Sequence, residues 1–253
     1  MKKEINKKFE YISKSKPLVS VIIPSFNRFD YLKNAIQSIF KQTYDNFEVI
    51  IINDGSTDKR YLDIDFGSKV HTVHLKQNQK EVYGFGPGSI RNHGTNKANG
   101  DLLAFLDDDD IWLEEKLDRQ LQEMSVNNIG MSSTEAFFGK GIYDKNKKYP
   151  LYIADKYIKD IKYLYRKTNY INQNNLPKLW DYEFTNIHNC FVTSSVIIEK
   201  KTFDILGGFR GLPLWADYDC WLGLQELTDS VFIKEPLVSV SYTHLRAHET
   251  DSY

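Results

Sequence analysis

The chain has 253 residues, 41% of them hydrophobic and 14% aromatic, enough to bury a substantial core in one domain. Its formal net charge is -1, so there is no global basic field of the kind that binds nucleic acid. The two cysteines, Cys190 and Cys220, form no CxxC pair. A disulfide between them and two free thiols are both open, and we expect free buried thiols.

The two ends of the chain differ in character from the rest. Residues 1–16 are rich in lysine and have no apolar stretch, so we expect a flexible leader and no signal peptide. No window approaches the roughly 18 apolar residues that span a bilayer. We therefore expect a soluble, cytoplasmic protein, with leader lysines able to contact the inner face of the membrane. Residues 241–253 are polar and poorly patterned, and we expect them to lie outside the domain.

The first half of the chain alternates predicted strands and helices. Short apolar runs rich in Val and Ile predict strands at Leu18–Pro24, Phe47–Ile52, Val70–Leu75 and Asp101–Leu106. Amphipathic spacing predicts helices at Asp30–Phe40, with Asp30 as N-cap, at Ser89–Asn99 and at Trp112–Met124. Repeated units of this kind predict an α/β fold with a mostly parallel sheet covered by helices on both faces.

The second half is less regular. Residues 139–180 are dense in Lys, Tyr and Asn, and we interpret them as an insertion around short helices. Regular elements resume after it: a strand at Phe191–Ile198, a short helix ending at Gly207, a helix at Asp217–Leu227 and a strand at Val231–Val240.

Four consecutive aspartates, Asp107 to Asp110, directly follow the predicted strand that ends at Leu106. Like charges this close repel, and burying any of them without a partner is costly. A solvated acidic loop is the simpler interpretation. A divalent cation bound to a phosphorylated substrate also explains the cluster, because carboxylate oxygens suit Mg²⁺ and Mn²⁺.

Other polar residues also follow predicted strands. Asn27 and Arg28 come after the first strand, and Asp54 comes after the second. In parallel α/β sheets, ligands bind beyond the carboxyl ends of the strands. We therefore expect these residues and the four aspartates to share one edge of the sheet, and this favours a ligand site over a solvated loop.

Four ordered blocks of the chain resemble the glycosyltransferases of family 2. These blocks are VSVIIPSFNR (19–28), IIINDGSTD (50–58), IRNHG (90–94) with GDLLAFLDDDD (100–110), and GGFR (207–210) with ADYDCWL (216–222). The resemblance covers roughly residues 17–240 in the expected order. Four such blocks together are far more specific than a lone DxD motif.

The resemblance implies the GT-A fold. Residues 17–131 would form the Rossmann-like half that binds the nucleotide sugar, and residues 132–240 the acceptor half with its insertion at 139–180. Family members transfer a sugar from a nucleotide diphosphate donor with inversion at the anomeric carbon, using Mg²⁺ or Mn²⁺. The implied partners are a nucleotide-sugar donor, with UDP preferred, and a carbohydrate or lipid-linked saccharide acceptor.

The resemblance assigns the metal to the four aspartates Asp107 to Asp110, which we call the acidic segment. Asp109 would ligate the ion directly, and Asp107 would share in metal binding. Asp107 or Asp108 would face the ribose hydroxyls or the water around the ion. We expect Asp110 and Trp112 to begin the next helix, where a carboxylate favours the helix dipole.

The resemblance also assigns donor contacts. Asp54 would accept a hydrogen bond from the nucleotide base; the alternative is that Asp54 only makes a turn. Pro24 and Phe26 would line the base pocket, and Arg28 would complete the donor side of the site. Arg91, near a helix start, would grip the diphosphate oxygens; its alternative is a surface salt bridge.

Asp217 occupies the position of the family's catalytic base, where a carboxylate takes the proton of the acceptor hydroxyl. The preceding position, usually Glu, is Ala216 here. Asp219 is the second candidate for the base, and a simple helix cap is the alternative role for Asp217. A nucleotidyltransferase and a non-catalytic homologue that binds sugar nucleotides remain alternative functions.

Overall fold

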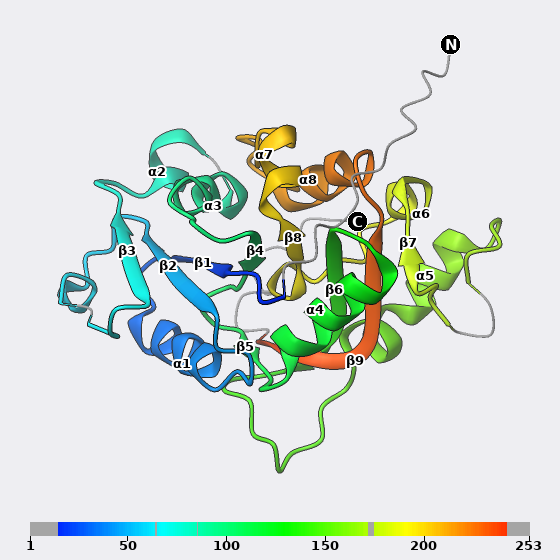
Figure 1. Ribbon diagram of the computed structural model, residues 1–253, viewed down its shortest axis with the longest axis horizontal. Helices are drawn as coiled ribbons and strands as arrows, with labels where there is room; N and C mark the ends of the chain where they lie inside the picture. The colour runs from blue at the N-terminus through cyan, green and yellow to red at the C-terminus, as the bar shows by residue number, and fades with distance from the viewer. Residues whose placement is uncertain (1–14, 64, 85, 172–174, 242–253) are drawn as a thin grey trace.

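The strands of the computed structural model run through both halves of the chain (Figure 1). They are β1 (Val19–Ser25), β2 (Phe47–Asn53), β3 (Val70–His74), β4 (Leu102–Phe105), β5 (Ile111–Trp112), β6 (Met131–Gly139), β7 (Leu179–Trp180), β8 (Ile197–Glu199) and β9 (Ser230–Ser241). The structure describes residues 15–63, 65–84, 86–171 and 175–241. Within them, the strands form one sheet in the order β3-β2-β1-β4-β8-β6-β9-β5, with β7 paired to β9.

The helices follow the same chain order. They are α1 (Phe29–Phe40), α2 (Gln79–Tyr83), α3 (Pro87–Thr95), α4 (Lys116–Asn127), α5 (Ile158–Tyr165), α6 (Tyr182–Ile187), α7 (Lys200–Leu206) and α8 (Ala216–Gln225). Three single turns complete the set: the 3₁₀ turns η1 (Lys59–Tyr61) and η3 (Thr193–Ser195), and the π-turn η2 (Tyr152–Tyr157).

The sheet is mostly parallel, as the sequence predicts. Strands β1 to β4 run parallel to one another, and β6 runs parallel to β9. Strand β8 is antiparallel to β4 on one side and to β6 on the other, so it joins the two halves of the sheet. Because β8 runs against β4, the residues just before β8 lie at the edge where β4 ends.

Alternating side chains of the central strands fill two cores, one on each face. In β1, Val21 and Ile23 pack with α1 and α4, whereas Ile22 packs with α3, α7 and α8. Strand β2 repeats the pattern, with Ile51 on the first face and Ile52 on the second. Continuous apolar runs are typical of parallel strands buried on both faces. Figure 1 shows α1 on the opposite side of the sheet from α3, α7 and α8.

Two helix starts differ from the prediction. Ile111 and Trp112 pair with β9 as β5, and α4 begins only at Lys116, so the predicted helix start at Trp112 was wrong. The indole of Trp112 is fixed by its Nε1–H, which donates to the carbonyl of Ser194 at 2.7 Å. Asp30 does not cap α1, because it lies within the helix and pairs with Arg60.

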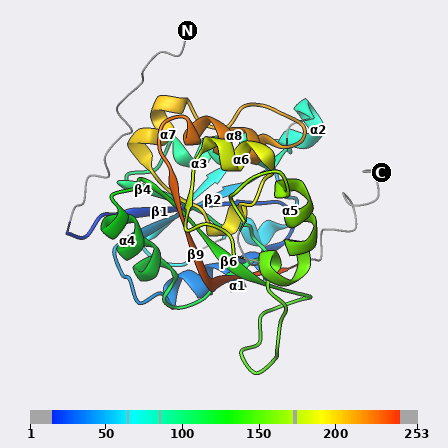
Figure 2. The same ribbon diagram turned by 90° about the vertical axis from the view of Figure 1, so that its right-hand side faces the viewer.

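The second half also differs in detail. Of the strand predicted at Phe191–Ile198, only the end is strand, and Thr193–Ser195 form η3. The sequence prediction missed β6, whose polar residues Ser132, Ser133 and Thr134 hide its strand character. Residues 139–180 contain η2, α5 and β7, and the loop before η2 extends away from the body of the molecule (Figures 1 and 2).

The cysteine prediction is confirmed, since Cys190 and Cys220 are free and buried. Burial raises the pKa of the Cys190 thiol to about 12. The pKa of Cys220 is raised in the same direction, again mainly by burial. Both groups therefore behave as small apolar side chains at neutral pH. In the described parts of the chain, every helix is too short or too polar to cross a bilayer.

Lys116, in the first turn of α4, is fully buried. Its Nζ lies 3.9 Å from the ring centroid of Trp112 and has no hydrogen-bond partner among the described residues. Burial holds the pKa of Lys116 well below its ordinary value. The unfolded chain therefore binds more protons between the two pKa values, and the cost of this lysine is greatest at low pH and fades as pH rises.

We expect Lys116→Met to raise the free energy of unfolding by about 1–3 kcal/mol at pH 7, because it removes a buried donor without a partner. The gain should be larger at pH 6 than at pH 9.5. Urea denaturation at three pH values measures it, with the exposed Lys41→Met as the control that changes little. A loss of stability at every pH would show that the Trp112 contact outweighs the buried charge.

Candidate active site

The acidic segment follows β4 and lies at the carboxyl ends of β1, β2 and β4, as predicted. It is no solvated loop. Asp108, Asp109 and Asp110 are only 4%, 8% and 5% exposed, and Asp107 is half-buried. Carboxylates at such depth cost free energy unless they are held by donors or neutralised by a bound cation. Each therefore needs a partner, from the protein or from a ligand.

Asp107 is held by Arg91 of α3. The guanidinium pairs with Asp107 Oδ1, and the Arg91 side chain is 3% exposed. The guanidinium carbon of Arg91 also lies over the ring of Phe209, 5.9 Å from the ring centroid. The ion pair considered as the alternative role of Arg91 is present, with a buried guanidinium and a carboxylate whose side chain is 39% exposed. Direct contact of Arg91 with a diphosphate stays a prediction, and the structure shows that it orients Asp107.

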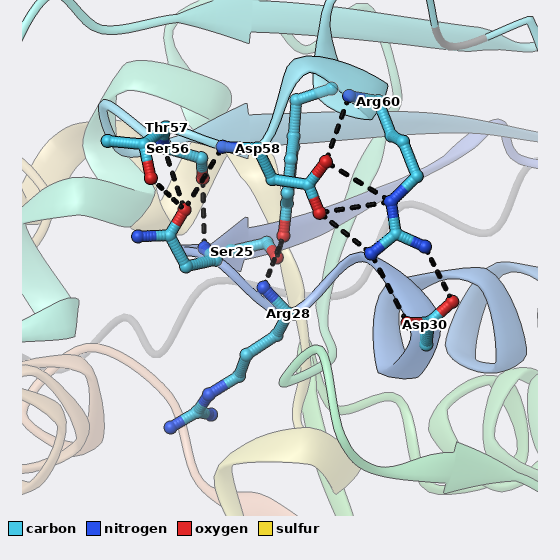
Figure 3. A network of polar contacts seen from close by, with 9 residues as sticks. Ser25, Arg28, Asp30, Ser56, Thr57, Asp58 and Arg60 are labelled. Carbon is cyan, nitrogen blue, oxygen red and sulfur yellow. Dashed lines mark hydrogen bonds and ion pairs between the residues drawn. The ribbon is translucent and has the colours of Figure 1, made fainter.

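Asp108 faces the end of β1. The Ser25 hydroxyl donates to Asp108 Oδ2 at 2.7 Å, and Arg28 Nη1 donates to Asp108 Oδ1 at 3.2 Å. The Tyr61 hydroxyl lies 2.5 Å from the Ser25 oxygen and accepts from the Arg28 backbone N–H at 2.9 Å (Figure 3). Burial, with repulsion from its acidic neighbours, raises the pKa of Asp108 to about 6. The donor contacts predicted for Asp108 and Arg28 stay predictions, and in the protein alone the two side chains bind each other.

Asp110 has a structural role that the sequence did not indicate. Its Oδ2 accepts from the Ser194 hydroxyl, and its Oδ1 accepts from the backbone N–H of Ser241 at 3.0 Å. Burial, followed by repulsion from Asp109 and Asp107, holds the pKa of Asp110 well above its ordinary value. The prediction that Asp110 begins a helix was wrong, because this carboxyl ties the acidic segment to η3 and to the end of β9.

Asp54 lies directly after β2 and is 3% exposed. Its carboxylate accepts from Asn78 Nδ2 at 2.9 Å and from the Gln79 backbone N–H at 3.0 Å. Burial raises the pKa of Asp54, against the lowering effect of the Gln79 N–H. The chain then turns at Gly55, whose φ is +72° and where an added Cβ would lie 2.6 Å from the backbone carbon of Gln77. The turn and the base contact are therefore compatible roles for Asp54.

A network of hydrogen bonds fixes the loop after β1 against the loop after β2. Asn27, in the left-handed region with φ of 53°, accepts from the Thr57 backbone N–H at 2.9 Å. The Asn27 N–H donates to the Ser56 hydroxyl at 3.0 Å (Figure 3). Pro24 and Phe26 are half-buried beside this network, consistent with the lining role predicted for both, which stays a prediction.

Asp217 is half-buried in the first turn of α8. Its Oδ2 accepts a hydrogen bond of 3.1 Å from the Thr193 hydroxyl. Asp219, two positions on, is instead taken up by Arg210, whose Nε donates to Asp219 Oδ2 at 2.6 Å. Asp217 is therefore the better candidate for the base. The unusual Ala216 is 4% exposed and packs on Gly88, where an added Cβ would lie 2.6 Å from the Ala216 Cβ.

The turn η3 connects Asp217 to the acidic segment. The Asp107 backbone N–H donates to the Ser194 hydroxyl at 3.0 Å, and Thr193, the adjacent residue, donates to Asp217. Two hydrogen bonds and one peptide unit thus join the candidate metal segment to the candidate base. The sequence analysis missed Thr193, Ser194, Ser25 and Tyr61; for Ser25, its position at the end of the first strand was a usable signal.

This arrangement places the carboxylate of Asp217 close to the four aspartates at the carboxyl end of β4. Among the described residues, no group of three or more His, Cys, Asp and Glu side chains is arranged to hold a metal ion. Two carboxylates of one loop, Asp107 and Asp109, therefore remain the candidates for a metal whose other ligands come from substrate and water.

Known proteins resemble this chain in sequence. The family model described as "Glycosyl transferase family 2" matches residues 20–199. An uncharacterized glycosyltransferase of Rickettsia bellii is 31% identical over 226 residues, which are 88% of this chain and 29% of that protein. The Escherichia coli protein WfgD, named as a UDP-Glc:alpha-D-GlcNAc-diphosphoundecaprenol beta-1,3-glucosyltransferase, is 38% identical over 44% of this chain and 43% of its own length. The chain thus spans about a third of the Rickettsia relative and less than half of WfgD.

Solved structures share the fold. S. aureus TarS (residues 1–349), in complex with UDP-GlcNAc, has a TM-score of 0.65 at 16% identity and matches 93% of this chain and 61% of that one. The mannosyltransferase PcManGT of Pyrobaculum calidifontis, in complex with GDP-Man and Mn²⁺, has a TM-score of 0.61 at 14% identity, with 90% and 58% covered. These likenesses confirm the expected GT-A fold. With the family model matching most of its length, the chain belongs to glycosyl transferase family 2.

Proposed function

We propose that this chain is the catalytic domain of an inverting, metal-dependent glycosyltransferase that uses a UDP-sugar and a saccharide or lipid-linked saccharide acceptor. One observation carries the proposal: η3 brings Asp217 and the acidic segment together from opposite halves of the sheet. A scaffold that only bound nucleotide would have no need of a half-buried carboxylate next to its acidic segment.

The names of similar proteins support the choice of donor and acceptor. WfgD is named for UDP-Glc and a GlcNAc-diphosphoundecaprenol acceptor, and TarS was solved with UDP-GlcNAc. In this chain, the buried Asp54 fits the contact with the nucleotide base, because a carboxylate can accept from the N3–H of uracil.

We infer that Asp109 and Asp107 hold Mg²⁺ or Mn²⁺. Mg²⁺ is usually bound through one or two carboxylates together with substrate phosphates and water, which these two side chains of one loop fit. When bound, such an ion neutralises the charge that develops on the departing diphosphate, a contribution of several kcal/mol. The buried Arg91 orients Asp107 for this task through their ion pair.

Asp217 acts on the acceptor. Its carboxylate takes the proton of the acceptor hydroxyl as that oxygen bonds to the anomeric carbon and the carbon–phosphate oxygen bond breaks. The bonding electron pair leaves with the nucleoside diphosphate, so a single displacement inverts the configuration and no covalent nucleophile is required. Trp215, 69% exposed just before α8, offers a flat face of the kind on which sugar rings pack.

Binding of the donor product tests the proposal. We expect UDP, at a hundred times its Kd and with Mn²⁺ present, to raise the melting temperature by roughly 5–10 °C. This shift should exceed the sum of the shifts that UDP and Mn²⁺ give separately. GDP and CDP with Mn²⁺ serve as controls and should raise it less.

A product assay then separates the alternatives. Release of UDP from UDP-glucose or UDP-GlcNAc is the expected result. Release of pyrophosphate from UTP and a sugar 1-phosphate, tested in a parallel assay, would indicate a nucleotidyltransferase. Binding of UDP without any turnover would indicate a non-catalytic homologue. If UDP and Mn²⁺ together left the melting temperature unchanged, the proposed donor site would be wrong.

A further inference from the structure

The hydrogen bond from Thr193 Oγ1 to Asp217 Oδ2, 3.1 Å long, joins two half-buried side chains from segments 24 residues apart. We propose that Thr193 is a positioning residue, which holds the catalytic carboxylate in its reactive orientation. The inference rests on the proposed function, because it assigns a role relative to Asp217 as the base.

Within the described part of the chain, the Asp217 carboxylate accepts a hydrogen bond from the Thr193 hydroxyl. The bond occupies Oδ2 and leaves Oδ1 for the hydroxyl of an acceptor. A hydrogen bond to one carboxylate oxygen fixes the side-chain rotamer. This orientation serves a general base, which must be correctly aimed before the acceptor binds.

Thr193 can position another residue because its own turn is anchored. The indole of Trp112 donates to the Ser194 carbonyl at 2.7 Å, and Gln120 Nε2 donates to the Ser195 carbonyl at 2.8 Å. The Ser195 hydroxyl accepts from the Thr134 backbone N–H at 3.1 Å. The carbonyls and hydroxyls of η3 are thus bound to β5, α4 and β6.

A role in helix capping does not explain the contact. The N-cap position of α8 is Trp215, which makes no side-chain capping bond. The Thr193 hydroxyl donates to a carboxylate, whereas a capping hydroxyl would accept from a backbone N–H of the first turn. Asp219, in the same first turn, is held by Arg210 instead. The two aspartates of this turn therefore have different partners, a neutral hydroxyl for Asp217 and a cation for Asp219.

The hydroxyl remains neutral in this mechanism. The acceptor proton moves to Asp217, while Thr193 keeps its own proton. Its hydrogen bond to Asp217 only becomes weaker, because a protonated carboxyl is a weaker acceptor than a carboxylate. Loss of the hydroxyl should therefore slow the transfer step and leave donor binding intact.

The test compares Thr193→Val, which removes the hydroxyl at nearly constant size, with Thr193→Ser, which retains it. The readout is UDP release from UDP-glucose and UDP-GlcNAc with Mn²⁺, with water as the acceptor. We expect Thr193→Val to lower kcat about tenfold with KM for the donor within about twofold, and Thr193→Ser to restore most of kcat. Should Thr193→Val not fold, Thr193→Ala carries the same expectation.

Thr202→Val is the matched control. Thr202 is buried in the first turn of α7, and its hydroxyl donates to the Glu199 carboxylate at 3.3 Å. The same substitution therefore removes the same kind of bond outside the site. We expect this variant to lose stability and keep its kcat. In the Asp217→Asn background, Thr193→Val should have little further effect, because the two residues act as one unit.

The outcomes separate this inference from the proposed function. An unchanged kcat in Thr193→Val, beside an inactive Asp217→Asn variant, would overturn the positioning role and leave the proposed function standing. A fully active Asp217→Asn variant would remove Asp217 as the base and overturn this inference. A wild-type chain that releases no UDP from either donor would contradict the proposed function.

Discussion

Replacing Asp109 by asparagine is expected to lower kcat for UDP release by about a thousandfold or more, because the amide cannot supply the charge that holds the metal against the donor diphosphate. Stability should not fall in parallel. The Asp109 charge repels Asp108 and Asp110 and raises the pKa of both, so its removal relieves repulsion. Turnover assays and a melting curve on the same sample measure the two effects, and manganese titration by calorimetry should show weakened binding.

The control is Asp118→Asn, which makes the same chemical change at an exposed carboxylate that bonds to Thr43 on the surface of α4. We expect its kcat and manganese binding to match the wild type. An Asp109→Asn variant that keeps full turnover with Mn²⁺ would remove Asp109 from the metal site and leave Asp107 as the candidate ligand.

The second large effect is expected at Asp217. Asp217→Asn preserves size and hydrogen bonding to Thr193 but cannot accept the acceptor's proton, so kcat should fall by about two to four orders of magnitude. Donor binding should persist, because Asp217 lies on α8 and the donor residues lie at the ends of β1, β2 and β4. Steady-state kinetics together with UDP binding by calorimetry separates the two quantities.

Asp219→Asn is the matched control, since both aspartates lie in the first turn of α8. Removing the Asp219 charge breaks its pair with Arg210, whose side chain is 73% exposed, so the arginine can be solvated by water once its partner is gone. We expect a change in kcat of less than threefold. The reverse pattern, with Asp219→Asn inactive and Asp217→Asn active, would transfer the role of base to Asp219.

The donor half could be predicted from the sequence because its signals are local. The runs Leu18–Pro24 and Phe47–Ile52 are apolar except for Ser20 and Glu48, and they became β1 and β2 almost residue for residue. The strands β5 and β7, of two residues each, could not be predicted, because they exist only through pairing with β9. Strand β6 was missed because the buried Ser132, Ser133 and Thr134 interrupt its apolar pattern. Of these, Ser132 accepts from the distant side chain of Gln120 at 2.9 Å.

The candidate site was likewise predictable only in part. The placement of Asp54 and Asp107 to Asp110 at one edge follows from parallel strands and was predictable. The hydroxyl groups that hold the carboxylates were not, since Ser25 and Asp108 are 83 residues apart and Thr193 and Asp217 are 24 apart. Serine and threonine are common residues, and their sequence neighbours do not reveal that they will face a carboxylate.

Strand β8 makes only three residue pairs with β4, from Leu102–Glu199 to Ala104–Ile197. A slip of one residue would turn Ile197 and Ile198 to opposite faces, and Thr193 and Ser194 would move away from the two carboxylates that they now reach. Ile197 packs in one core and Ile198 in the other, so the slip would also disturb both cores. The packing that holds this short strand in register therefore also keeps the donor residues aligned with the candidate base.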